Sequence, residues 1–395
     1  MQQFDAIIVG AGPAGSAAAK RLADSGLTVA VYDRREELGV PVRCGEGVEK
    51  KIEDFTGPIP SRAICQRVKG ARIYAPNGRF LEAPGLGYVL DRKVFDKWLA
   101  EEAVKAGARI QVNTLITDLV IEGGKVCGVR GISMGQHFES RAKVVIAATG
   151  AESPLAMQAG IRTNCPMQLV DTCLEYEMSG IKFRRPDDEE YIHIYLNNDI
   201  APRGYAWVFP KGSGSANVGL GVAPSVDIAK SARAYQDKFV SDNPDMFLGA
   251  SILEVKAGVV PVGGLIRNMV ADGFLVCGEA AHHVNPIHGG GIKEAVVSGQ
   301  IAADVVARAI KSGDVSKSAL AEFNTQWWNT RGEHLSKVEK LREVVEKLTN
   351  NDLNSLVDAL KPEDIIEFSR GERLSVLAKA LMRKPSLIAL ARHLI

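Results

Sequence analysis

The chain has no run of apolar residues long enough to cross a membrane. Its 395 residues are 46% hydrophobic, yet no apolar stretch reaches the ~18 residues that a spanning helix needs. The sequence runs directly into FDAIIVGAG, with no basic segment ahead of a long apolar one, so we expect no secretory leader. These features predict a cytoplasmic protein that can meet the inner face of a membrane only peripherally.

Cysteine is sparse and net charge is almost absent. The six cysteines, at positions 44, 65, 127, 165, 173 and 277, lack the paired spacing of a zinc site and the density of a secreted disulfide scaffold. The 48 Lys and Arg residues nearly cancel the 47 Asp and Glu residues, and no basic run alternates with aromatics, which excludes nucleic acid as a partner. His282, His283 and His288 show no metal-ligand spacing, so we expect no metal and interpret them as packed or hydrogen-bonded.

The order of predicted elements divides the chain into three parts. Residues 1–165 and 260–312 contain buried strands that alternate with helices, which predicts a discontinuous Rossmann-like α/β domain. Residues 166–259 alternate apolar and polar residues between Gly and Pro turns, which predicts an inserted antiparallel sheet, an α+β element. Residues 313–395 are predicted to form a C-terminal helical region.

A glycine-rich turn near the N-terminus predicts a dinucleotide site. GAGPAG follows a β-branched strand at residues 4–9 and opens a helix, which is the context that this motif requires. Its glycines allow a tight turn and close approach of the backbone to a pyrophosphate, and the helix N-terminus adds a positive dipole. An acidic residue ends the second strand, where it can accept from a ribose hydroxyl. The residues expected at this site are Gly10, Gly12, Ala14, Gly15 and Asp33.

Three later segments resemble those of a flavoprotein group. YVLDRKVFDKWL places Arg92 at a helix start, ATGAES closes a strand on Gly150, and GFLVCGEAAHHVNPIHGGGIKEA joins a strand to a second glycine-lined helix. Together with the first turn, this set resembles the flavoproteins that include p-hydroxybenzoate hydroxylase, over roughly residues 1–310. The resemblance implies FAD as the cofactor. One departure is Gly278-Glu279, where that group usually has Gly-Asp.

The resemblance implies further contacts with FAD. In this architecture the loop after the second strand, here PVRCGEGVEK at 41–50, runs beside the cofactor toward its reactive ring. Backbone amides in HGGGI at 288–292 would face the flavin N1 and C2 carbonyl and stabilise negative charge there. The implied FAD contacts beyond the glycine turn are Cys44, Gly45, Gly47, Arg92, Ile116, Glu279, Gly290, Gly291 and Ile292.

Two segments taken together are similar to geranylgeranyl reductases, in particular the archaeal enzymes that saturate the isoprenoid chains of membrane phospholipids. They are PVRCGEG and GYAWVFPKGSGSANVGLG, the second of which contains Tyr-x-Trp-x-Phe-Pro. The resemblance implies FAD-dependent reduction of isolated C=C bonds, with a hydride from flavin N5. It implies catalytic roles for Cys44, Tyr205 and Trp207, and substrate contacts for Tyr205, Trp207, Phe209, Pro210 and His288.

The residues leave several alternatives open. Cys44 could be a small packing residue or a polarisable group at the alkene. The aromatic residues at 205–209 could face the alkene and stabilise positive charge that develops on it, or they could be ordinary core residues of a half-buried strand. The C-terminal LSVLAKALMRKPSLIALARHLI could lie on anionic headgroups or cap the protein core.

The source of electrons and the reaction class also leave alternatives. GSGSANVG predicts a hairpin turn and not a second nucleotide site, so we expect an external donor, either NAD(P)H or a reduced ferredoxin. An aromatic monooxygenase of the same fold is one rival function. A non-catalytic prenyl-lipid carrier of the GDP-dissociation-inhibitor type is another, and it predicts a degraded FAD site. The sequence does not distinguish a phospholipid from chlorophyll or a free diphosphate as the substrate.

Overall fold

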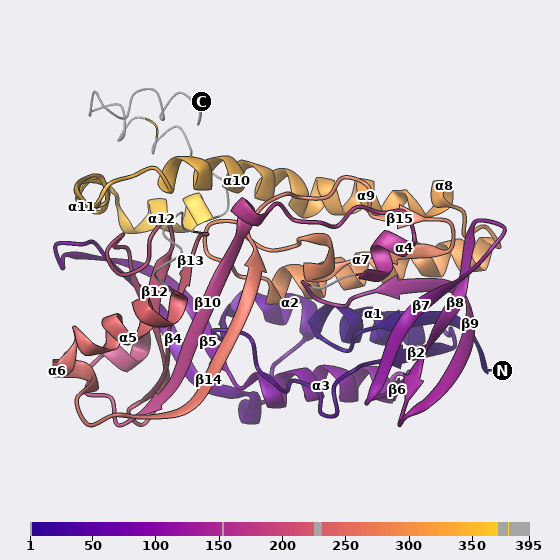
Figure 1. Ribbon diagram of the computed structural model, residues 1–395, viewed down its shortest axis with the longest axis horizontal. Helices are drawn as coiled ribbons and strands as arrows, with labels where there is room; N and C mark the ends of the chain where they lie inside the picture. The colour runs from indigo at the N-terminus through magenta and orange to yellow at the C-terminus, as the bar shows by residue number, and fades with distance from the viewer. Residues whose placement is uncertain (1, 152–153, 225–230, 370–377, 379–395) are drawn as a thin grey trace.

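The protein is built on two sheets, each of eight strands in the described part of the chain. The computed structural model describes residues 2–151, 154–224, 231–369 and 378. Figure 1 shows the two sheets toward opposite ends of the long axis, with α9 (Glu322–Trp327) and α10 (Glu333–Val345) along one long side. The helix α3 (Arg92–Lys105) runs along the other long side.

The first sheet carries the Rossmann-like unit that the sequence predicts. β1 (Gln2–Val9) pairs in parallel with β2 (Val29–Tyr32) and with β9 (Gln136–Ala147). The strand order is β15-β16-β9-β1-β2-β6, and the β7-β8 hairpin joins the sheet through β9. The remaining strands are β6 (Arg109–Gln111), β7 (Thr114–Glu122), β8 (Lys125–Ser133), β15 (Val270–Ala271) and β16 (Phe274–Val276).

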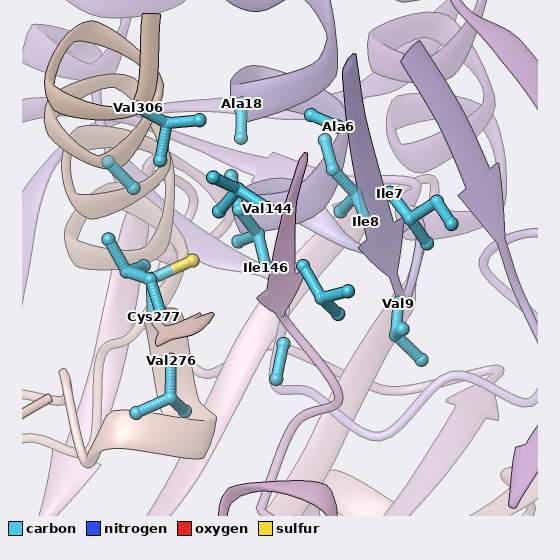
Figure 2. Packing of buried hydrophobic residues seen from close by; sticks show 14 of the residues in the cluster. Ala6, Ile7, Ile8, Val9, Ala18, Val144, Ile146, Val276, Cys277 and Val306 are labelled. Atoms are coloured by element: carbon cyan, nitrogen blue, oxygen red, sulfur yellow. The ribbon is translucent and has the colours of Figure 1, made fainter. Parts of the chain in front are cut away.

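The core of this unit lies between the sheet and the helices α1 (Pro13–Asp24) and α7 (Ile292–Ser312). Figure 2 shows Ile8 of β1 and Ile146 of β9 side by side, with Ala18 of α1 and Val306 of α7 beside them. These four side chains are fully buried. Strands covered on both faces are expected to be continuously apolar, which explains the uninterrupted runs AIIV and VVIAA.

The second sheet is antiparallel except for one parallel pair, β11 with β4. Its order is β14-β10-β13-β12-β11-β4-β5-β3. The strands are β3 (Gly47–Glu49), β4 (Ile64–Tyr74), β5 (Phe80–Leu90), β10 (Val170–Ser179), β11 (Tyr191–Tyr195), β12 (Tyr205–Gly212), β13 (Ser215–Val222) and β14 (Ser251–Pro261). The helices α5 (Ala232–Ser241) and α6 (Pro244–Phe247) cover one face of this sheet with Phe239 and Phe247. GSGSANVG forms the β12-β13 hairpin, as predicted.

Membership of the sheets does not follow the predicted division of the chain. Residues 47–90 contribute β3, β4 and β5 to the second sheet, although residues 1–165 were all expected to belong to the cofactor domain. The parallel pairing of β11 with β4 places this early segment in the second sheet. Such a pairing joins strands that are distant in the sequence, so local patterns do not reveal it. The three domains, as independent units, remain a prediction.

Helices continue through the described residues after 315, as predicted. They are α8 (Lys317–Leu320), α9, a π-helical turn (Trp328–Gly332), α10, α11 (Asn350–Ala359) and α12 (Pro362–Ser369). Two short helices elsewhere are α2 (Glu53–Thr56) and α4 (Pro154–Gln158). The predicted amphipathic segment at 374–395 lies outside the described residues apart from Ala378. Where the helices are described, none is long and apolar enough to span a bilayer.

Candidate active site

A large cavity of about 2000 Å³ is lined by residues of both sheets and of the C-terminal helices. Pockets for one small molecule usually measure about 300–1000 Å³. The volume therefore leaves room for a dinucleotide together with a second large ligand.

The glycine turn between β1 and α1 opens onto this cavity. Gly10 has a φ of +101°, and a Cβ there would lie 2.3 Å from the Ala148 carbonyl oxygen. A Cβ on Gly15 would lie 1.8 Å from the Gly10 carbonyl oxygen, so both positions are closed by the protein itself. Gly12 lines the cavity and has open space where a Cβ would stand. It is also the N-cap of α1 and has no side chain to satisfy the first amides. The turn thus fits a pyrophosphate held by backbone amides at a helix N-terminus.

Asp33 follows β2 and lies at the cavity, close to this turn. Its carboxylate accepts the Ala11 amide at 2.8 Å and the Arg35 guanidinium at 2.8 and 2.9 Å. Burial alone would raise the pKa of Asp33, but these donors hold it below the ordinary value. The carboxylate is therefore ionised at neutral pH, and a ribose hydroxyl would share it with Arg35. Ala14 and Ile116 line the same cavity.

The second glycine-lined segment reaches the cavity from β16 and α7. Glu279 lies in the helical turn after β16 and lines the cavity. Burial raises the pKa of its carboxyl, although the Ala151 amide and the Arg92 charge oppose that rise. The Gly290 amide donates to His288 Nδ1 at 3.1 Å. It is therefore engaged locally, and this differs from the expectation that it faces the flavin. The amides of Gly291 and Ile292, at the start of α7, are the better candidates for that contact.

Cys44 lines the cavity in the loop that precedes β3. Its Sγ accepts the Glu46 amide at 3.2 Å. Burial raises the pKa of the Cys44 thiol, although the nearby Arg92 charge opposes that rise. The thiol therefore stays neutral near pH 7 and is no nucleophile, while both the packing and the polarisable interpretations remain compatible with it.

Arg92 begins α3 and stabilises this loop. Its backbone amide donates to Glu46 Oε1 at 2.8 Å, and its guanidinium forms a bidentate pair with Asp96 at 2.8 and 3.0 Å. Asp91 is the N-cap of the helix. The side chain of Arg92 faces the cavity and supplies positive charge near Cys44.

The aromatic signature on β12 is divided by the alternation of the strand. Tyr205, Trp207 and Phe209 line the cavity. Pro210 is buried and pairs in register with Ala216. Since successive side chains of a strand point to opposite faces, Pro210 lies away from the cavity wall, and the predicted substrate contact of Pro210 is not supported. Tyr205 instead reaches His288, because its hydroxyl donates to the His288 carbonyl at 2.7 Å.

The two segments that carry the geranylgeranyl reductase resemblance lie in contact. The Phe209 ring packs over the loop glycines, since a Cβ on Gly45 or Gly47 would lie 3.2 or 3.0 Å from its Cε2. A Cβ on Gly45 would also lie 3.4 Å from Trp207 Nε1. The Cys44 loop and the aromatic strand therefore form one wall, although about 160 positions separate them in the chain.

A buried group of charged residues that adjoins this wall was not predicted. Trp207 Nε1 donates to Glu175 Oε2 at 2.8 Å, and Lys256 Nζ lies 3.3 Å from Glu175 Oε1. The other charged members are Glu46, Glu177 and Lys211. The neutral Asn217 donates to Glu46 and accepts from Lys256. The available signal was the alternation in DTCLEYE, which places 173, 175 and 177 on one face. We name Glu46, Glu175, Glu177, Lys211 and Lys256 the charge cluster.

The other two histidines of the predicted group are structural. His282 places Nδ1 at 2.8 Å from the Gly264 carbonyl and Nε2 at 3.0 Å from the Thr163 carbonyl. His283 is buried and stacks on Trp327 with ring centroids 3.8 Å apart. These contacts confirm the hydrogen-bonded and packed interpretations. Among the described residues, no group of three or more His, Cys, Asp or Glu is placed to hold a metal ion.

The cavity has an apolar limb that extends to the C-terminal helices. On the sheet side it is lined by Val68, Ile73, Ile192, Ile194 and Leu196. On the helix side it is lined by Leu341, Val345, Leu353, Leu356, Leu360 and Ile365. This limb suits a long, flexible hydrocarbon chain more than a compact aromatic molecule, because aliphatic side chains from the second sheet and from the C-terminal helices line it.

Sequence comparisons agree with this geometry. Residues 5–208 match the FAD dependent oxidoreductase family, and residues 170–260 match the geranylgeranyl reductase catalytic domain. The digeranylgeranylglycerophospholipid reductase of Methanocella arvoryzae is 40% identical over 393 residues, 98% of this chain and 97% of the relative. Digeranylgeranylglycerophospholipid reductase 2 of Methanopyrus kandleri is 38% identical over 397 residues, 99% of each chain.

Solved structures with similar folds include a reductase-like protein and a halogenase. A geranylgeranyl bacteriochlorophyll reductase-like protein from Thermoplasma acidophilum superposes with a TM-score of 0.90 at 33% identity, over 100% of both chains. A flavin-dependent brominase superposes with a TM-score of 0.75 at 16% identity, over 94% of both chains, which is a likeness of fold alone. The full-length matches, together with the glycine cradle and the Cys44 and Trp207 wall, show that this chain belongs to the FAD-dependent geranylgeranyl reductase family.

Proposed function

We propose that the protein is a digeranylgeranylglycerophospholipid reductase, which saturates C=C bonds in the isoprenoid chains of a membrane phospholipid. The observation that carries the proposal is the continuity of one cavity. The same space contains a dinucleotide cradle at Gly12 and an aliphatic limb that reaches Leu356. Cys44 and Trp207 also line it.

The cradle would hold FAD through residues that the site already presents. The amides at the start of α1 and the Gly12 opening suit the pyrophosphate, and Asp33 suits the ribose. Gly291 and Ile292, at the N-terminus of α7, suit the electron-rich edge of the reduced ring because the helix dipole favours negative charge there. When bound and reduced, FAD supplies the hydride for the alkene.

The wall opposite would orient the alkene. An isolated double bond has no carbonyl to polarise, so the protein gains nothing from an oxyanion hole and needs no nucleophile. The faces of Tyr205, Trp207 and Phe209 can pack against a flat alkene and stabilise positive charge that develops on it. The neutral thiol of Cys44 would fill the space beside the alkene. Packing of this wall against the lipid would also exclude water from the reacting carbons.

The apolar limb would receive the rest of the isoprenoid chain. Burial of each CH₂ is worth about 0.8 kcal/mol when the group leaves water, but a chain that leaves a bilayer comes from surroundings that are already apolar. The limb therefore has to be as apolar as the bilayer interior that the chain leaves. We infer that the protein collects its substrate peripherally at the membrane surface and that NAD(P)H or a reduced ferredoxin reduces the cofactor.

The test is a reduction assay on the purified protein. We expect a yellow protein whose flavin, reduced with dithionite under anaerobic conditions, is reoxidised by a digeranylgeranyl glycerophospholipid. Mass spectrometry should show the lipid gaining mass in steps of two hydrogens. A colourless protein that binds the lipid unchanged would favour a carrier. A yellow protein that turns over only with oxygen and an aromatic compound would favour a monooxygenase.

A further inference from the structure

The charge cluster extends from the cavity to a partly exposed carboxyl, that of Glu177. Glu175 forms part of the cavity wall, and its side chain is 4% exposed. Lys256 Nζ lies 3.3 Å from Glu175 Oε1 and 3.1 Å from Glu177 Oε2. Glu175 and Lys256 line the cavity, whereas Glu177 does not. The side chain of Glu177 is 24% exposed. Three side chains in van der Waals or hydrogen-bonding contact therefore lead from the cavity to the surface.

The charges of the cluster do not balance when every carboxyl is ionised. The two ammonium groups of Lys211 and Lys256 are shared by the carboxyls of Glu46, Glu175 and Glu177. Glu46 and Glu177 each contact both lysines, whereas Glu175 contacts Lys256 alone. Glu175 therefore has the least positive charge beside it. Because a buried carboxylate is costly without such compensation, Glu175 is the carboxyl of the cluster that most readily stays protonated.

The neighbours of Glu175 from each adjoining element support this assignment. On its own strand are Cys173 and Glu177, and the facing loop brings Cys44 and Glu46. β14 brings Lys256, and β12 brings Trp207. Burial raises the pKa of Glu175 to about 7, and the Glu46 charge adds to that rise against Lys256 and the Trp207 N–H. An acid with this pKa can both give and regain a proton near neutral pH.

We propose that Glu175 donates the proton of the reduction and that Lys256 and Glu177 return a proton to it from solvent; the proposal rests on the proposed reduction of a C=C bond. The π bond breaks as one carbon receives a hydride, with both electrons, from the reduced FAD. The other carbon receives the proton of the Glu175 carboxyl, whose O–H bond breaks to leave a carboxylate. The Lys256 ammonium then reprotonates Glu175, and Lys256 regains a proton through Glu177 from water. Each reduced bond thus consumes one hydride and one solvent proton.

The first test is Glu175→Gln in the FAD-loaded enzyme, with a digeranylgeranyl glycerophospholipid as the probe. The amide oxygen of Gln still accepts the Trp207 N–H, but the side chain is no acid. We expect a single-turnover rate at least ~100-fold lower, the usual worth of general acid catalysis. The wild-type rate should fall as the pH rises above about 7, and the variant should lose this dependence. The flavin spectrum and the affinity for the lipid should stay unchanged.

A purely structural role would give a different result. If Glu175 only positions Trp207, Glu175→Gln retains a rate within threefold of the wild type and keeps the pH dependence, and that outcome overturns the proton path alone. A wild-type protein that never reduces the lipid would overturn the proposed function as well. The wild-type assay shows this outcome before any variant is made.

The outer end of the path is tested by Glu177→Gln. We expect the first reduction to proceed at the wild-type rate and later reductions to slow about tenfold or more, because Glu175 is reloaded slowly. A small permeant acid such as imidazolium should restore multiple turnover. The matched control is Glu190→Gln, an exposed carboxyl paired with Lys69, which should change neither phase. Equal slowing of the first and later reductions in Glu177→Gln would contradict the relay.

Discussion

The Trp207 indole lies against the backbone of Gly219 on the neighbouring strand. A Cβ on Gly219 would come within 2.6 Å of Trp207 Cζ2. Gly221, two residues further along β13, adds space beside the same ring, since a Cβ there would lie 3.9 Å from Cζ3. The absence of these two side chains lets the indole lie flat, and in that position its Nε1 meets Glu175 at 2.8 Å. The GLG of β13 therefore positions the aromatic face of the cavity.

We predict that Gly219→Ala displaces Trp207. Overpacking of a well-filled site costs typically 1–3 kcal/mol. The new Cβ would meet both the indole and the Leu174 carbonyl oxygen, the latter at 2.8 Å. Relief of these contacts displaces the indole, so lipid reduction should fall at least ~10-fold. Urea unfolding and the reduction assay measure the two effects. Gly85→Ala is the control, because a Cβ at this cavity-lining glycine meets no atom within 4 Å. If Gly219→Ala keeps the stability and activity of the wild type, the position of the indole against Gly219 is not needed for either, and the prediction is wrong.

Two glycines of the first turn should behave in opposite ways. Gly12→Ala places its methyl group in open cavity space, at an ordinary φ of −75°. It should leave the stability of the FAD-free protein unchanged while weakening FAD binding at least ~10-fold, because the methyl takes the space of the pyrophosphate. Gly15→Ala should destabilise the FAD-free protein itself, because its Cβ would lie 1.8 Å from the Gly10 carbonyl oxygen. Thermal unfolding without FAD and flavin titration separate the two effects, and equal loss of stability in both variants would refute the distinction.

The sequence could place the glycine turn and the acidic residue of the cofactor side because that side is local, and their contacts with FAD stay a prediction. Gly10, Gly12 and Gly15 lie within one turn, and Asp33 follows the next strand, so strand, turn and helix patterns suffice to place them. The proximity of the Cys44 loop to the aromatic strand was also accessible, but only through a resemblance to known enzymes. No property of either segment alone indicates that the two lie in contact.

The rest depended on pairings between strands that are distant in the chain. Glu175 and Lys256 meet because β10 pairs with β14, in a register that sets Glu175 opposite Lys256. The alternation of each strand shows which residues share a face, but not which strand lies beside it. The same limit explains why β4 was assigned to the first domain. The exclusion of Pro210 from the cavity, by contrast, follows from alternation once Tyr205 and Trp207 are known to face inward.

The raised pKa of Glu175 predicts a pH-dependent stability. The carboxyl has an ordinary pKa of 4.5 and one of about 7 in the folded protein, so between these values the folded state holds a proton that the unfolded state has released. Stability therefore falls as the pH rises from 4.5 through 7, by on the order of 3 kcal/mol in total. The Glu175→Gln variant cannot ionise and should lose this part of the decline. Urea unfolding at pH 5 and pH 8 measures it, and equal declines in the two proteins would contradict the raised pKa.

The last prediction concerns the ion pair that joins the C-terminal helices to the second sheet. Arg342 of α10 donates to both oxygens of Asp171 on β10, at 2.7 and 3.0 Å, and also to the Pro286 carbonyl at 2.9 Å. Both side chains are buried and line the cavity. Removal of one partner from a buried pair usually costs about 3–5 kcal/mol, because the other charge is left uncompensated.

Arg342→Met should therefore lower the free energy of unfolding by about that amount, and the added change Asp171→Asn should restore part of it. Arg79 and Asp358 form the matched control, since this pair also joins the second sheet to a C-terminal helix but has side chains that are 70% and 44% exposed. Arg79→Met should cost less than about 1 kcal/mol. Because Arg342 also lines the cavity, its loss should admit water and slow lipid reduction, whereas Arg79→Met should not. Equal costs for the two arginines would mean that the buried pair does not hold the helices in place.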